Sequence, residues 1–224
     1  MLKILRTRFK QGCRTMLFPK VKAPALPERY RGRPIIAGQK DSVDLGVISF
    51  NPDSDIVYSN DYQMAVSQRQ DLVLSQDHAM VLARALNDKM LKIFGRSLKL
   101  RQVSAGGCNA CELDLNVLNT PVFDLSRFGI QFVASPRHAD GIVVTGPISR
   151  NMREALLKTY EAIPEPKLVI AVGSCAISGG LFSDSPQVSK GLNTIIPVDL
   201  FIPGCPPHPL TILDGFLRLL DRLE

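Results

Sequence analysis

From residue 98 onward, short apolar runs alternate along the chain with runs that have apolar residues at helical spacing. The short runs predict five strands, at residues 98–103, 130–134, 141–145, 168–172 and 200–202. The helical spacing predicts helices after residue 108 and at residues 151–163 and 209–223. Unbroken apolar strands are typical of a parallel sheet that is buried on both faces. Strands alternating with helices therefore predict an α/β fold, with a parallel sheet and helices on both faces.

The first 97 residues have a different pattern. Only residues 1–10 have helical spacing there, and prolines exclude a long helix from the rest of 1–40. Residues 43–50 and 55–58 predict two short strands joined by a turn at 51–54. Apolar residues at helical spacing then predict a helix over residues 76–94.

That last helix has plausible boundary residues. Ser75 is a suitable N-cap and Gly95 a suitable terminator. His78 would then be a surface residue of the first turn and not a ligand. The apolar stripe of this helix is expected to be ordinary core.

Charge is concentrated at the N-terminus. Residues 1–40 contain eleven Lys or Arg and one acid, a net charge of +10, whereas the remaining residues have a net charge of −4. We therefore expect an extended basic arm over residues 1–40, ordered only against another surface. An anionic membrane face or an acidic partner subunit would suit it, and a plain solvated face is the alternative. Because no nucleic-acid motif or aromatic interleaving accompanies these charges, no nucleic-acid partner is predicted.

The apolar runs and the cysteines indicate the cellular compartment in which the protein is expected. No apolar run approaches the roughly 18 residues of a membrane span, and the N-terminus lacks the features of a signal peptide. Five unevenly spaced cysteines do not resemble a secreted disulfide framework. A reducing compartment is therefore expected, with the thiols used for a metal. Cys13 lies far from the other cysteines and is expected to be a spare thiol.

The other four cysteines share a setting. Cys108 and Cys111 form a C-x-x-C motif after a glycine turn, while Cys175 and Cys205 each follow a glycine-containing loop. Cys108, Cys175 and Cys205 each come after a predicted strand. Because the carboxyl ends of parallel strands meet at one edge of a sheet, we expect a single site there.

Three chemistries suit four thiols. A structural zinc ion usually takes two C-x-x-C knuckles on a small module, and this chain has one knuckle and two single cysteines. A 4Fe–4S cluster also takes four thiolates, and ligands from separate loops suit its larger size. A disulfide is disfavoured by the expected compartment. Spacing alone places the cluster ahead of zinc without excluding zinc.

Six segments, in this order and spacing, closely resemble one family over about residues 98–223. The segments are Cys108-Asn109-Ala110-Cys111-Glu112, Phe128-Gly129-Ile130-Gln131, Ser135-Pro136-Arg137-His138-Ala139-Asp140, Val144-Thr145-Gly146-Pro147, Gly173-Ser174-Cys175-Ala176 with Gly179-Gly180, and Pro203-Gly204-Cys205-Pro206-Pro207. The family is the small, cluster-bearing subunit of membrane-bound nickel–iron hydrogenases of the formate hydrogenlyase type and the 20 kDa subunit of respiratory complex I. The resemblance implies a flavodoxin-like domain over residues 98–224 that binds one 4Fe–4S cluster on Cys108, Cys111, Cys175 and Cys205.

The resemblance also implies a role and partners. It implies electron transfer to or from a large hydrogenase-like or complex I 49 kDa-like subunit that carries the catalytic centre, so no catalytic residue is expected on this chain. Ferredoxin-type and membrane subunits are further implied partners, and the implied location is the cytoplasmic inner face of the cell membrane. The C-x-x-C form is that of the hydrogenases, since complex I subunits have two adjacent cysteines there. Quinone reduction of the complex I type is therefore the alternative function, and a zinc-stabilised assembly module is a more remote one.

The N-terminal part resembles a second protein more weakly. Three segments are similar to the two-cluster ferredoxin subunit of the same complexes: Tyr30-Arg31-Gly32-Arg33-Pro34, Val43-Asp44-Leu45-Gly46 and the region from Tyr62-Gln63-Met64-Ala65 through Asp71-Leu72-Val73. Residues 35–61 contain no cysteine. Residues 41–97 are therefore expected to be a degenerate ferredoxin-like module with a helix, which has lost its clusters and serves as a docking surface.

Five polar residues near these motifs have open roles. Glu112 either faces the partner subunit or stabilises the start of its helix. Arg137 either lies over the cluster or forms a surface salt bridge. His138 is expected in a solvent-exposed loop, His208 at the start of the last helix, and Asp140 as a brace before the third strand.

Overall fold

Five parallel strands form the central sheet in the computed structural model, which describes residues 2–12, 14–37, 41–47, 55–75 and 80–223. The strands are β5 (Leu98–Ser104), β6 (Ile130–Phe132), β7 (Gly141–Thr145), β8 (Leu168–Val172) and β9 (Leu200–Ile202). Their order in the sheet is β6-β5-β7-β8-β9, and each pair is parallel. The order reverses direction at β5, as in flavodoxin-like folds. The predicted parallel α/β sheet is thus confirmed.

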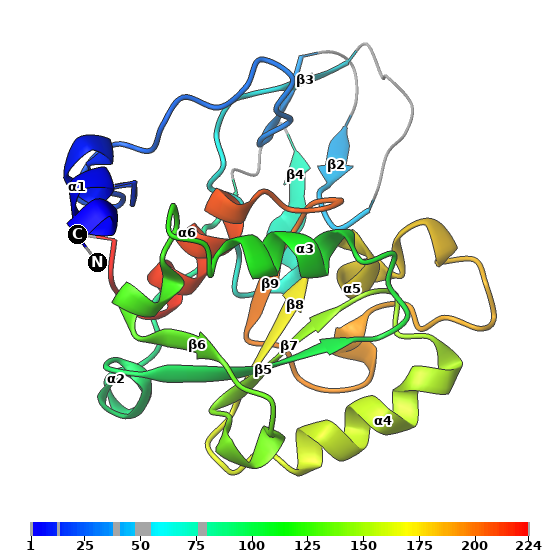
Figure 1. Cartoon of the computed structure of the whole chain (residues 1–224). Helices are drawn as coiled ribbons and strands as arrows, with labels where there is room; N and C mark the ends of the chain where they lie inside the picture. Colours follow the sequence, from blue (N-terminus) through cyan, green and yellow to red (C-terminus); the bar gives the residue numbers. More distant parts are fainter. Residues whose placement is uncertain (1, 13, 38–40, 48–54, 76–79, 224) are drawn as a thin grey trace.

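Helices cover both faces of this sheet (Figure 1). Four α-helices surround it: α3 (Ala110–Val117), α4 (Arg150–Glu161), α5 (Ser174–Ser178) and α6 (Pro209–Leu219). Short 3₁₀ turns occur at η2 (Leu125–Phe128), η3 (Pro136–His138), η4 (Gly180–Phe182) and η5 (Leu192–Thr194). The predicted helices 151–163 and 209–223 therefore exist, although both end earlier than predicted.

Two buried clusters occupy the two faces of the sheet. Val143 packs into the cluster that contains α3 and α6, whereas its neighbour Val144 packs into the cluster that contains α4 and α5. This alternation follows from the strand, in which successive side chains point to opposite faces. All five residues of β7 and all five of β8 are buried, which explains their unbroken apolar sequences.

The N-terminal region adds one helix and two small sheets. Helix α1 (Leu2–Gln11) confirms the predicted N-terminal helix. Strands β1 (Pro34–Ile36) and β3 (Ile56–Tyr58) form one antiparallel pair, and β2 (Ser42–Asp44) and β4 (Val73–Ser75) form the other, after the turn η1 (Arg69–Leu72). Strands β2 and β3 overlap the two predicted strands, 43–50 and 55–58, but they pair with β4 and β1 and not with each other. The predicted turn at 51–54 lies outside the described residues.

Among the described residues of the helix predicted over 76–94, residues 80–87 are not helical, so the prediction is wrong there. Only α2 (Asp88–Phe94) is helical, and Asn87 caps it by accepting a hydrogen bond from the Met90 amide at 3.0 Å. The preceding segment bonds to other parts of the chain instead: the Ala83 amide donates to the Ala65 carbonyl, and the Leu86 amide donates to the Leu219 carbonyl. His78 lies outside the described residues.

The segment between α1 and β1 packs onto the large domain. Phe18 is buried in the same core cluster as α3 and α6, and its ring meets that of Tyr62 edge to face at 5.9 Å. Arg127 donates hydrogen bonds to the carbonyls of Met16 and Phe18, at 2.6 and 2.7 Å. The basic segment after α1 is thus ordered in part against the large domain of the same chain.

Candidate metal centre

The four predicted cysteines lie in loops at the carboxyl edge of the central sheet. Cys108 and Cys111 follow β5, with Cys111 in the first turn of α3, while Cys175 is the second residue of α5, shortly after β8, and Cys205 follows β9. Cys108 and Cys205 are exposed, and Cys111 and Cys175 are half-buried. All four are free thiols. Cys13 lies outside the described residues.

The four thiols are close enough for their charges to interact. Burial raises the pKa of Cys111 far above its ordinary value, and Glu112 and the other three thiols raise it further. Burial also raises the pKa of Cys175 and of Cys205, with Cys108 adding to both shifts. Four thiolates here would repel one another in a partly desolvated site, so a bound cationic centre would be needed to hold them all ionised.

Two glycines provide room for the sulfur atoms. A Cβ at Gly173 would lie 2.5 Å from the Cys111 Sγ, and a Cβ at Gly180 would lie 2.6 Å from the Cys175 Sγ. Both glycines have positive φ angles, +89° and +59°, which L-residues with side chains rarely adopt. The backbone therefore approaches these thiols more closely than another residue would permit.

Hydrogen bonds join the loops after β8 and β9. The Gly173 amide donates to the Ile202 carbonyl at 2.9 Å, and the Ser174 amide donates to the Gly204 carbonyl at 2.9 Å. The Ser174 hydroxyl also donates to the Gly204 carbonyl, at 3.2 Å. These bonds fix the separation of the loops that carry Cys175 and Cys205.

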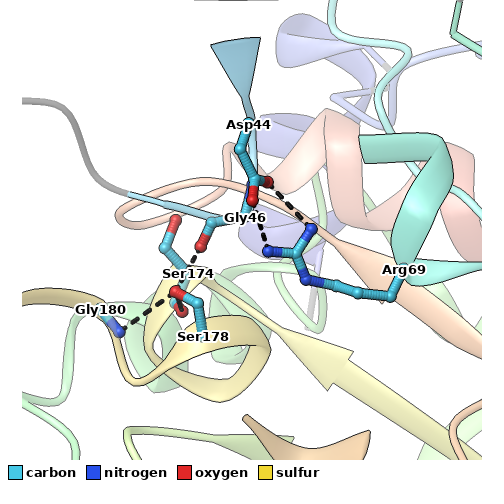
Figure 2. A network of polar contacts seen from close by, with 6 residues as sticks. All are labelled: Asp44, Gly46, Arg69, Ser174, Ser178 and Gly180. Atoms are coloured by element: carbon cyan, nitrogen blue, oxygen red, sulfur yellow. Dashed lines mark hydrogen bonds and ion pairs between the residues drawn. The ribbon is translucent and has the colours of Figure 1, made fainter. Parts of the chain in front are cut away.

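A contact that the sequence did not predict joins the N-terminal region to α5 (Figure 2). The Ser178 hydroxyl donates to the Gly46 carbonyl at 2.6 Å. Asp44 accepts hydrogen bonds from the Gly46 amide at 2.8 Å and from both terminal nitrogens of Arg69, at 2.9 and 2.6 Å. A Cβ at Gly46 would lie 2.7 Å from an Ile177 methyl carbon, so the segment lies directly against α5, the helix that contains Cys175. The two partners are 132 residues apart, and no local pattern marks such a contact.

A cleft of about 500 Å³ lies beside Cys205. Its lining includes Arg29, Arg31 and His208. His208 is the N-cap of α6, as predicted: its Nδ1 accepts a hydrogen bond from the Leu210 amide at 3.1 Å, and burial lowers the pKa of the imidazole. The Tyr30 ring meets the His208 ring edge to face at 5.4 Å, which joins the N-terminal segment to the loop of Cys205.

The remaining polar residues have defined positions. Glu112 is buried, and its carboxylate accepts a hydrogen bond from the Thr145 hydroxyl at 2.6 Å. Asp140 braces the start of β5, because its carboxylate accepts a hydrogen bond from the Lys99 amide at 2.7 Å. Arg137 and His138 lie in the exposed turn η3, and neither is among the charges that shift the pKa values of Cys111, Cys175 and Cys205.

The two candidate metal groups place different demands on the thiols. Among the described residues, no three His, Cys, Asp or Glu side chains converge closely enough to hold a single metal ion. A 4Fe–4S cluster takes one thiolate at each iron, so its ligands need not meet at one point. Four thiols from three segments of the chain, whose charges interact, are compatible with such a cluster, and two of them face glycines that leave space beside sulfur.

Comparison with known proteins identifies the family. Residues 108–219 match the model of the NADH ubiquinone oxidoreductase 20 kDa subunit family. The chain belongs to this family, which includes the small subunits of nickel–iron hydrogenases.

Individual relatives include subunits of hydrogenases and of complex I. A probable membrane-bound hydrogenase subunit of Pyrococcus furiosus is 44% identical over 135 residues, 60% of this chain and 81% of that protein. Formate hydrogenlyase subunit 7 of Escherichia coli is 44% identical over 62% of this chain and 55% of its own length. An NADH-quinone oxidoreductase subunit of Carboxydothermus hydrogenoformans is 47% identical over 53% of this chain and 72% of its own length.

A solved structure resembles the same part of the chain. A chain of the membrane-bound sulfane sulfur reductase, an archaeal respiratory membrane complex, superposes with a TM-score of 0.53 at 34% identity, covering 62% of this chain and 77% of that chain. Several relatives are thus subunits of membrane-bound complexes. In the described part of this chain, none of the helices has both the length and the apolar character needed to span a membrane.

Proposed function

We propose that this chain is an electron-transfer subunit that binds one 4Fe–4S cluster through Cys108, Cys111, Cys175 and Cys205. The observation that carries the proposal is the position of four thiols, from the three segments that follow β5, β8 and β9, at one edge of the sheet. The bound cluster would supply one-electron redox chemistry. The chain's own residues position the thiols, restrict water around Cys111 and hold the loops at fixed separations.

The family supports a place for this relay in a larger assembly. We propose a membrane-bound hydrogenase-like or complex I-like complex, in which a large subunit carries the catalytic centre and receives or supplies the electrons. Membrane subunits and ferredoxin-type subunits would complete it, at the cytoplasmic face of the membrane. The C-x-x-C motif of Cys108 and Cys111 favours the hydrogenase type over the quinone-reducing type.

Site-directed removal of one ligand tests the cluster. The full-length chain would be purified anaerobically and examined by iron analysis and electron paramagnetic resonance after reduction. Cys175→Ala is expected to lose the 4Fe–4S signal or convert it, whereas Cys13→Ala is the matched control and is expected to retain it. An unchanged 4Fe–4S spectrum in the Cys175 variant contradicts the ligand assignment.

Iron content tests the proposed division of the chain. We propose that residues 1–40 are a basic segment, that residues 41–97 are a ferredoxin-like module without clusters, and that residues 98–224 hold the single cluster. One four-cysteine cluster corresponds to about four irons per chain. A value near eight contradicts the division, and a colourless protein with stoichiometric zinc supports the assembly-module alternative instead.

A further inference from the structure

Helix α1 presents an apolar stripe to solvent. Leu2, Leu5 and Phe9 recur at positions i, i+3 and i+7, which places them on one face of the helix. Phe9 is 87% exposed, Leu2 84% and Leu5 51%. No described residue of α1 is buried, and a groove of about 860 Å³ separates the helix from Pro121. No other part of the described chain therefore covers the stripe.

Cations border this stripe on both sides. At 100° per residue, Arg6 lies beside Leu2, and Arg8 lies beside Leu5 on the other border. Lys3 and Lys10 add two further positive charges to the helix. The sequence has no Asp or Glu before Glu28. A short apolar face with Lys and Arg along its borders is typical of helices that lie in a membrane interface.

We propose that α1 is an interfacial helix that binds the anionic lipid surface of the membrane. The apolar stripe would enter the boundary between headgroups and acyl chains, and the bordering cations would contact lipid phosphates. An acidic protein surface would satisfy the cations as well. The membrane is favoured because the apolar residues and the cations beside them face one surface, and a lipid interface offers apolar and anionic groups side by side. This inference does not depend on the cluster.

Binding through α1 alone is expected to be weak. Three apolar side chains bury little area, and stable membrane attachment usually needs two signals. Docking to the other subunits would supply the second signal, since two linked binding sites together give a higher affinity than either site alone. Binding of the isolated chain should therefore be measurable at low salt and weaken strongly as ionic strength rises.

The absence of tryptophan from the sequence permits a direct test. Phe9→Trp introduces a single fluorescent probe into the stripe, and Ile4→Trp places the same probe on the opposite side of α1. The full-length variants would be titrated with vesicles of phosphatidylcholine, with and without phosphatidylglycerol. We expect a blue shift for Trp at position 9 with anionic vesicles only, and a much smaller shift for Trp at position 4. Equal shifts at both positions, or none at position 9, overturn the proposal.

A pair of charge substitutions separates lipid from protein as the partner. Phe9→Glu and Ile4→Glu change the net charge equally, but only the first disrupts the apolar stripe. In vesicle co-sedimentation we expect roughly ten-fold weaker binding for Phe9→Glu and a clearly smaller loss for Ile4→Glu. Circular dichroism should show both variants folded, because neither side chain is buried. If Phe9→Glu binds vesicles like the wild type but detaches from the purified complex, α1 docks on a subunit and the lipid proposal is wrong.

Discussion

Gly173 and Gly180 set how closely the backbone approaches two of the thiols. Both face a cysteine sulfur at a distance that a Cβ would not tolerate. The role of such residues is to leave space and not to contribute contacts. Glycines stand beside the cysteines in the sequence, but the sequence does not assign each glycine to a sulfur, because Gly173 faces Cys111, which comes from a different segment.

Gly173→Ala is therefore expected to displace Cys111. The added Cβ would lie 2.5 Å from its Sγ, so the sulfur must move. Gly12→Ala is the matched control: Gly12 also has a positive φ, +67°, but nothing lies within 4 Å of the added Cβ. Backbone strain contributes as well at Gly173, whose φ of 89° and ψ of 152° lie in a region that is essentially confined to glycine. We expect Gly173→Ala alone to lose iron or to change the cluster spectrum, and equal iron contents in the two variants would contradict the role of this glycine.

His208 links pH to the stability of the Cys205 loop. Its Nδ1 must remain unprotonated to cap α6, and burial lowers its pKa from the ordinary value of 6.5. The unfolded chain therefore binds a proton at higher pH than the folded chain does. The resulting loss of stability begins as the pH falls through about 6.5 and becomes complete below the lowered pKa of the folded state.

His208→Asn should remove this pH dependence, because Asn is a good N-cap that does not titrate. Thermal unfolding between pH 8 and pH 5 would compare the two proteins. The melting temperature of the wild type should fall more steeply below pH 6.5. His208→Ala should be less stable than the wild type by about 1 kcal/mol at pH 8, and this difference should shrink towards pH 5 as the wild type loses its cap. Parallel pH profiles for wild type and His208→Asn would show that another group is responsible.

At the scale of elements, three strands were predicted with the bounds that the structure has: 141–145, 168–172 and 200–202. They are buried on both faces, so their apolar pattern has no competing interpretation. The helix predicted over 76–94 was wrong over residues 80–87, where the apolar pattern does have a second interpretation. Its apolar residues contact the core from a segment whose amides bond to Ala65 and Leu219, so long-range contacts produce a spacing that resembles a helix.

The same limit applies to the candidate site. The four cysteines meet at the carboxyl edge of the sheet because they follow the ends of parallel strands, and the predicted topology is enough to place them there. The contacts of Gly46 with Ser178 and of Tyr30 with His208 come from segments more than a hundred residues apart, and no local pattern encodes them. Both contacts connect the N-terminal region to elements that carry a cysteine.

The Asp44–Arg69 pair should act as a brace on α5. Asp44→Asn removes the ion pair and weakens the turn that presents the Gly46 carbonyl to Ser178. The pair is partly exposed, so its loss is expected to cost about 1 kcal/mol. The Arg33–Asp61 pair, at 2.6 Å in the same N-terminal region, provides the control substitution Asp61→Asn.

We expect faster loss of iron to a chelator in Asp44→Asn than in Asp61→Asn, because only the first loosens α5, the helix that contains Cys175. Rates would be followed by the absorbance of the iron–chelator complex at constant temperature. If the two variants lose iron equally fast, the brace has no specific effect on the candidate site.

At the scale of the whole molecule, the basic N-terminal region divides into two parts with different roles. Helix α1 has no buried side chain, whereas the segment after it inserts Phe18 into the core and gives two carbonyls to Arg127. An extended arm over residues 1–40 would be dispensable for folding throughout. The contacts of Met16, Phe18 and Tyr30 indicate that only about the first dozen residues are dispensable for folding.

Deleting residues 2–12 should therefore leave the free energy of unfolding nearly unchanged, while Phe18→Ala in the full-length chain should lower it substantially. Truncating a buried Phe costs about 3 kcal/mol or more, which for a domain of this size corresponds to a fall in melting temperature of roughly 6–12 °C. Deleting residues 2–34 should cost at least as much, because Arg127 then loses both of its carbonyl partners and the core loses Phe18. Thermal unfolding of the three variants measures the difference directly. If the protein without residues 2–34 melts like the wild type, the packed segment contributes nothing to the domain. If the protein without residues 2–12 is as unstable as Phe18→Ala, then α1 belongs to the folded core and is not a surface helix.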